Sequence, residues 1–124
     1  QAIHDSPRRS DIEVQGFVSN QQLEQLYQRA SVFFFCSLDE GFGMPVLDAM
    51  AHGIPVVTSN RSAMPEVAGD AAVLANPEDV EEMSAALSQA AQDSSGGRRG
   101  WARAQQFSWE KAVEATWRVY EELR

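Results

Sequence analysis

Short apolar runs that alternate with helix-like segments dominate the pattern of this chain. The runs at 32–36, 55–59 and 72–75 are rich in apolar and β-branched residues, as is typical of parallel strands that are covered on both faces. The segment 11–18 alternates apolar and polar residues, which also predicts a strand. Strands that alternate with helices form a parallel sheet with right-handed crossovers. We therefore expect an α/β fold, with a parallel sheet flanked by helices.

Capping residues and helical spacing predict the helices of this fold. Ser19 begins a Ser-x-x-Gln capping box, and apolar residues follow it at helical spacing. Ser108 is placed to cap a last helix, 109–123, in which large apolar residues form one stripe. Asp93–Gly97 is rich in Ser and Gly and is expected to be a flexible connector. The other helices are expected at 45–52, at 76–91 with Asn76 as the cap, and at 98–107.

Length and charge exclude several classes of function. The chain has 124 residues, enough for one domain that spans 1–124. It has 10 Lys plus Arg against 18 Asp plus Glu, which argues against a nucleic-acid partner and against peripheral contact with an anionic membrane. Cys36, the single cysteine, rules out an internal disulfide framework and a Cys-rich zinc site. With no apolar run near ~20 residues and no signal-peptide pattern, we expect a cytoplasmic protein.

The segment after the run at 32–36 contains the clearest candidate site. It reads Glu40-Gly41-Phe42-Gly43-Met44-Pro45, and ligands of open parallel sheets bind beyond the carboxyl ends of the strands. The glycines allow close backbone approach, and a helix start offers free N–H groups, which suits a phosphate or sugar phosphate. Glu40 and Asp48 could accept hydrogen bonds from vicinal hydroxyls. On spacing alone, acidic residues that merely stabilise the start of a helix explain the pattern equally well.

A longer stretch resembles a known family. The pattern Glu40-Gly-Phe-Gly-x-Pro-x-x-Asp48-Ala-Met-Ala-x-Gly53-x-Pro55-Val-Val57 looks like the signature of retaining nucleotide-sugar glycosyltransferases of the GT-B fold, family 4 or "group 1". The resemblance runs from about Ile12 to the end of the chain. It implies the later part of the C-terminal, donor-binding domain, which is a partial Rossmann-like parallel sheet flanked by helices. The family's acceptor-binding domain would lie outside this chain.

The resemblance also implies roles for particular residues. Glu40 is expected to bind hydroxyls of the donor sugar, and it is the one residue expected to be catalytic. Asp48 stands where the family usually has Glu and is expected to bind the ribose. The donor is a nucleoside-diphosphate sugar, which is a substrate, and no metal or cofactor is implied. The residues expected to line the sugar and the diphosphate are Gly41, Phe42, Gly43, Met44 and Pro45, and those expected at the nucleobase are Gly16, Phe17 and Val18.

Parts of the family's domain have no counterpart in this sequence. In the family's sheet order, 3-2-1-4-5-6, the strands at 11–18 and 32–36 are third and fourth, and two absent strands lie between them. We expect the two segments either to pair directly or to be covered by a homodimer or by a partner that supplies the missing half, because bare edges are normally covered. The basic pair that clamps the diphosphate in the family is absent too. The aromatic residues of the last helix must likewise dock on the chain itself or on a partner.

Three functions remain open on the sequence. The first is a glycosyltransferase part that binds a nucleotide sugar and, with the acceptor domain, transfers a hexose with retention. By itself such a chain is expected to be inactive. The second is a non-catalytic remnant or assembly module that acts through a partner chain. The third, a sugar-nucleotide epimerase of related fold, is less consistent with the Glu-Gly-Phe-Gly motif.

Overall fold

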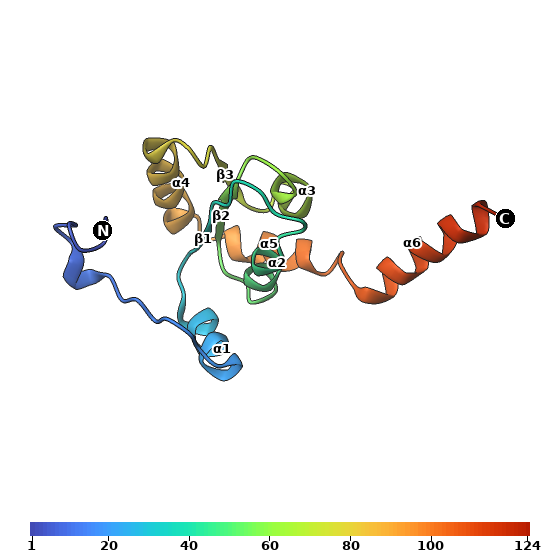
Figure 1. Ribbon diagram of the computed structural model, residues 1–124, viewed down its shortest axis with the longest axis horizontal. Coiled ribbons are helices and arrows are strands. Elements are labelled where there is room, and N and C mark those ends of the chain that lie inside the picture. The colour runs from blue at the N-terminus through green and yellow to red at the C-terminus, as the bar shows by residue number, and fades with distance from the viewer.

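The computed structural model describes residues 1–124, with a three-stranded parallel sheet at the centre (Figure 1). The strand order is β1 (Phe33–Phe35), β2 (Val56–Ser59) and β3 (Val73–Ala75). In the register of the sheet, Thr58 of β2 lies beside Phe35 of β1 and Leu74 of β3. Every residue of β2 is buried because a strand covers each of its edges and helices cover both faces. These three strands confirm the predicted runs and the α/β class.

Six α-helices and one short 3-10 helix complete the chain. The capping box at Ser19 is present, and Ser108 accepts a hydrogen bond from the Lys111 N–H at the start of the last helix. The prediction of Asn76 as a helix cap is wrong, because Asp79 caps that helix by accepting from the Glu82 N–H. The helices are α1 (Asn20–Arg29), α2 (Met44–Ala51), α3 (Met64–Ala68), α4 (Val80–Gln92), α5 (Gly96–Ala104) and α6 (Trp109–Glu122), with the 3-10 helix at Arg9–Asp11.

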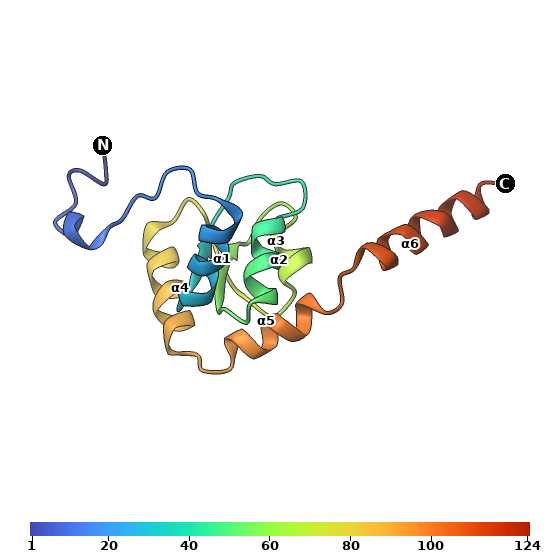
Figure 2. The ribbon, with the colours of Figure 1, turned by 90° about the horizontal axis from the view of Figure 1, so that it is seen from below.

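Helices cover the two faces of the sheet unequally (Figures 1 and 2). Adjacent side chains of a strand point to opposite faces, so Val56 and Val57 of β2 belong to different apolar clusters. Val56 packs with residues of α2, α3 and α5 in the larger cluster. Val57 packs against Ala86 and Ala90 of α4 in the smaller one. The larger cluster includes three residues of α2, which fixes this helix and with it the end of the segment 40–43, here called the candidate loop.

The predicted flexible connector is wrong in its second half. Gly96 and Gly97 are buried residues of the first turn of α5. A Cβ on Gly97 would overlap the carbonyl oxygen of Gly53, the residue that ends the turn after α2. Gly97 therefore serves close packing of α5 against the turn after α2 rather than flexibility.

The predicted strand at 11–18 is also wrong. Residues 13–18 form neither helix nor strand and make no hydrogen bond, and the Phe17 side chain is fully exposed. The predicted direct pairing with β1 is therefore wrong as well, and β1 has β2 as its one neighbour. Alternation describes the two faces of a strand, but a strand forms only where a neighbour accepts and donates hydrogen bonds.

Helix α6 extends away from the rest of the chain (Figures 1 and 2). None of its residues is buried, and Trp109 and Trp117 are 79% and 58% exposed. Docking of these aromatic residues on their own chain is therefore wrong, whereas docking on a partner stays a prediction. None of the helices in the structure has the length and apolar content needed to cross a membrane.

Candidate functional site

The candidate loop connects the carboxyl end of β1 to the start of α2. Its last residue, Gly43, has a φ of 94° and stands immediately before the first turn of α2. This conformation favours glycine, and a Cβ at this position would also overlap the methyl group of Met64, at the start of α3. The backbone at Gly43 is thus held between the left-handed turn and the buried Met64 side chain.

The loop presents a row of unpaired backbone donors. The N–H groups of Gly41, Phe42, Gly43 and Met44 donate no hydrogen bond within the chain. The next residue, Pro45, has no N–H, and the Val46 N–H donates to the Gly43 carbonyl at 3.0 Å. Gly41, Phe42 and Met44 are exposed. Consecutive free N–H groups at a helix start can bind an anion such as a phosphate.

Ser62, just before α3, fixes the backbone of Glu40. The Glu40 N–H donates to the Ser62 hydroxyl at 3.0 Å. The same hydroxyl lies 2.8 Å from an Asp39 carboxylate oxygen and 2.9 Å from the Glu40 carbonyl, and its one hydrogen can serve either. Ser62 itself has a φ of 57°. Its role could be anticipated only from its position after β2, at the same sheet edge as the loop.

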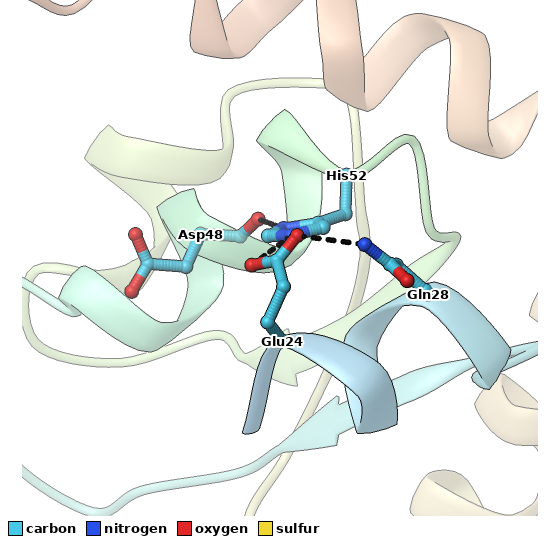
Figure 3. A network of polar contacts seen from close by, with 4 residues as sticks. All are labelled: Glu24, Gln28, Asp48 and His52. Carbon is cyan, nitrogen blue, oxygen red and sulfur yellow. Dashed lines mark hydrogen bonds and ion pairs between the residues drawn. The ribbon is translucent and has the colours of Figure 1, made fainter. Parts of the chain in front are cut away.

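The carboxylates of Glu40 and Asp48 are both free of partners inside the chain. Neither accepts a hydrogen bond or forms an ion pair. Asp48 lies on α2 one turn after Met44, so the two exposed side chains share one face of the helix. In Figure 3 the Asp48 carboxylate points away from His52, while its carbonyl oxygen faces the His52 ring.

His52, at the end of α2, ties the same helix face to α1 (Figure 3). Its Nδ1 lies 2.7 Å from the Asp48 carbonyl oxygen, and its Nε2 lies 2.9 Å from both carboxylate oxygens of Glu24. The ring stacks on Tyr27 with centroids 4.8 Å apart. The bonds to the Asp48 carbonyl and to Glu24 raise the pKa of His52, and the bond from His52 lowers the pKa of Glu24.

An apolar hollow of about 700 Å³ adjoins the loop. Phe42 of the loop contacts Phe107 edge to face, with ring centroids 6.0 Å apart. The hollow lies between this aromatic pair, the exposed start of α2 and the first turn of α6. Its apolar lining consists of Phe42, Met44, Leu47, Phe107, Trp109 and Ala112.

The structure does not bring every predicted site residue together. Residues 40–45 and Asp48 lie on one loop and the helix that follows it, whereas Gly16, Phe17 and Val18 lie in the segment without hydrogen bonds. Arg61, the basic residue that follows β2, is engaged by Glu78 and Asn76. No group of three or more His, Cys, Asp or Glu side chains is placed to hold a metal ion. Cys36 is half-buried, and this partial burial raises the pKa of its thiol.

The sequence matches known proteins. The family described as "Glycosyl transferases group 1" matches residues 2–93. The O-antigen chain mannosyltransferase B of Escherichia coli is 42% identical over 99% of this chain and 33% of its own length. The MMP alpha-(1->4)-mannosyltransferase of Mycolicibacterium hassiacum is 38% identical over 84% of this chain and 27% of its own length.

A solved structure shows the same fold. Sucrose-phosphate synthase from Thermosynechococcus elongatus has a TM-score of 0.72 and 26% identity over 87% of this chain and 29% of its own. The chain belongs to the group 1 glycosyltransferases and has the α/β arrangement of part of their GT-B fold. It spans about one third of the length of the E. coli relative. The family expected from the Glu40–Val57 pattern is thereby confirmed.

Proposed function

We propose that this chain is the donor-binding part of a retaining hexosyltransferase that uses a nucleoside-diphosphate sugar. The observation that carries the proposal is the row of four free N–H groups, Gly41 to Met44, directly after the unpaired carboxylate of Glu40. Amides can bind the diphosphate, whose charge they stabilise as the leaving group departs. A carboxylate one residue away can bind the hydroxyls of the attached sugar.

The remaining roles follow from this placement. The free Asp48 carboxylate, on the same helix face as Met44, is positioned to accept hydrogen bonds from ribose hydroxyls. Asp is one methylene shorter than the Glu usual in the family, so this contact requires a closer ribose or a bridging water. Binding of the nucleobase by Gly16, Phe17 and Val18 requires that their segment fold onto the loop when the donor binds.

The sugar we propose is mannose. Two relatives that align with most of this chain are named as mannosyltransferases, in Escherichia coli and in Mycolicibacterium hassiacum. The acceptor site and the basic clamp of the diphosphate would belong to the two thirds of such a relative that this chain does not cover. We therefore propose that the chain alone binds donor without transferring the sugar, that it works in the cytoplasm, and that the uncovered part, or a second copy, lies against the outer edge of β1.

A second candidate function is that of an assembly module. The apolar stripe of α6 favours it, because Trp109, Trp117 and Tyr120 are 79%, 58% and 63% exposed. Contiguous exposed apolar patches are typical of surfaces that contact another protein. A module of this kind has no need for Glu40 or for the free amides, so donor binding distinguishes the two functions.

The test is ligand-observed NMR on the purified chain with UDP-glucose, GDP-mannose and ADP-glucose. The proposal expects saturable binding of one of the three, with GDP-mannose favoured. Excess of the matching nucleoside diphosphate should displace the sugar nucleotide. Absence of binding by all three at millimolar concentration, in a chain that NMR shows to be folded, would contradict donor binding and leave the assembly module.

A further inference from the structure

The guanidinium group of Arg103, in the last turn of α5, joins three parts of the chain. Its Nε donates to the Val67 carbonyl at 3.0 Å, and its Nη2 donates to the Glu66 carbonyl at 2.6 Å. Its Nη1 donates to the Gln106 side chain at 2.8 Å. Its Cζ also lies 5.1 Å from the centre of the Phe107 ring. One half-buried side chain thus contacts α3, the residues after α5 and an aromatic ring.

The contact with α3 leads to one side of the candidate loop. Glu66 and Val67 lie near the end of a helix whose last carbonyls have no partners within it, so the guanidinium caps this end with charge-assisted bonds. At the other end of α3, the Met64 side chain packs on Gly43 and Ser62 holds the Glu40 N–H. Because α3 has only five residues, fixing one end fixes the other.

The contact with Phe107 leads to a second residue of the loop, Phe42. The guanidinium lies over the Phe107 ring, and this ring in turn meets the Phe42 ring nearly perpendicularly, at 84°. Phe42 is 41% exposed, and Phe107 is the aromatic ring that contacts it. Arg103 therefore acts on residues 40 and 43 through α3 and on residue 42 through Phe107.

We propose that Arg103 is a positioning residue that holds the loop 40–43 through two separate contacts, one with α3 and one with Phe107. The inference rests on the proposed function only in what the loop binds. Lysine does not reproduce these contacts, because its single ammonium nitrogen lacks the planar fork with which the guanidinium donates to two carbonyls while it lies over a ring. A Cβ on Gly69 would lie 3.2 Å from the Arg103 Cζ, so the guanidinium fits into space that this glycine leaves open.

Methionine methyl groups report on the loop without any ligand. The chain has 4 methionines, and two of them, Met44 and Met64, flank the loop. Met83 of α4 lies in the smaller apolar cluster and serves as a reference far from the loop. The ¹³C-methyl NMR spectrum of the full chain is compared for the wild type, Arg103→Lys and Arg99→Lys. The second variant is a matched control, because Arg99 is also on α5 and pairs instead with Asp93 at 2.5 Å.

The expected result separates the two arginines. Arg103→Lys shifts or broadens the Met44 and Met64 signals and leaves Met83 in place, whereas Arg99→Lys leaves Met44 and Met64 unchanged. Unchanged Met44 and Met64 signals in Arg103→Lys would overturn the inference, as would equal shifts in both variants. This outcome does not depend on donor binding.

Donor affinity gives the second readout. Arg103→Lys should bind the sugar nucleotide about tenfold more weakly than Arg99→Lys, which corresponds to about 1.4 kcal/mol, when both variants have similar unfolding midpoints. Equal affinities would contradict a positioning role. If the wild type binds no sugar nucleotide but Met44 and Met64 respond as expected, the proposed function fails and the positioning of the loop stands.

A third variant covers the case in which Arg103→Lys does not fold. Phe107→Leu removes only the ring that contacts both Arg103 and Phe42, and it leaves the α3 carbonyls capped by Arg103. It should weaken donor binding several-fold while Met83 keeps its wild-type signal. Wild-type affinity in Phe107→Leu would then overturn the inference.

Discussion

The Nε2 atom of His52 lies 2.9 Å from both carboxylate oxygens of Glu24, which joins the end of α2 to α1 (Figure 3). The other ring nitrogen lies 2.7 Å from the Asp48 carbonyl oxygen. Both nitrogens thus face acceptors. A neutral imidazole has one N–H, so only the protonated ring can donate to both. The contact between His52 and Glu24, which holds α1 beside Asp48, therefore depends on the protonation of His52.

The first prediction is that stability falls as the pH rises from 6 to 9. The pKa of His52 is raised by its bonds to the Asp48 carbonyl and to Glu24. The stabilisation that protonated His52 gives the fold is therefore complete below about pH 6.5, and it is lost as the pH rises through the pKa of His52 in the folded state. The pKa of Glu24 is lowered, so its contribution is lost only as the pH falls below about 4.5. Thermal unfolding at about pH 5.5 and 8.5 measures the difference.

The matched variant for this prediction is His52→Asn. It should unfold at a lower temperature than the wild type at pH 5.5. Its unfolding temperatures at pH 5.5 and 8.5 should differ much less than those of the wild type. The effect is modest, because the His52 side chain is 24% exposed and solvent screens such pairs. An identical pH dependence in the variant would show that another group causes it.

The second prediction concerns Gly43. Ala at this position should destabilise the chain by roughly 1–3 kcal/mol, because a φ of 94° is strained for any other residue and the new methyl group meets Met64. Urea unfolding measures the loss. Gly41→Ala is the control: its Cβ meets nothing within 4 Å, and a change within about 0.5 kcal/mol is expected. Equal stabilities of the two variants would mean that Gly43 is not under this constraint.

The third prediction concerns the packing of α5 on α2. Gly97→Ala should cost roughly 1–3 kcal/mol of unfolding free energy, because the methyl group overlaps the Gly53 carbonyl and forces the helices apart. At Gly96 the nearest atom would be 3.4 Å away, so Gly96→Ala should be neutral or slightly stabilising, as expected of Ala in a helix. Chemical denaturation of both variants decides this, and tolerance of Ala at Gly97 would contradict close packing.

The fourth prediction separates the two properties of Ser62. Gly at this position relieves the backbone strain of a φ of 57°, but it removes the hydroxyl that accepts the hydrogen bond from the Glu40 N–H. Ser62→Gly should therefore keep the unfolding midpoint close to that of the wild type while donor affinity falls several-fold. Calorimetric titration with the sugar nucleotide measures the affinity. Undiminished affinity would show that Glu40 is positioned without Ser62.

The strands and most helices could be predicted because their signals are local. The apolar runs at β1 and β2, the capping box at Ser19 and the cap at Ser108 all act within a few residues. The segment 11–18 could not, because its alternation lacks a neighbouring strand in this chain. Gly96 and Gly97 have the composition of a linker, and only the contact of Gly97 with Gly53, distant in sequence, shows that Gly97 is needed for packing.

The residues of the candidate site could be predicted from the sequence, but the residues that hold them in place could not. Glu40, the glycines and Asp48 form one continuous pattern, so a single segment of sequence predicts the site. Ser62 and Met64 contact that segment from more than 20 residues away in the sequence, and Arg103 caps α3 through the Glu66 carbonyl, 37 residues away. Contacts of this kind depend on how the helices pack, which no local pattern encodes.

The central claim is that Glu40 binds the donor sugar beside amides that bind the diphosphate. Its most direct test is calorimetry with a sugar nucleotide and with the corresponding nucleoside diphosphate, on the wild type, Glu40→Gln and Asp48→Asn. The wild type should prefer the sugar nucleotide, Glu40→Gln should lose that preference while binding the diphosphate as before, and Asp48→Asn should weaken both ligands alike. A Glu40→Gln variant that keeps the full preference for the sugar nucleotide would contradict the account.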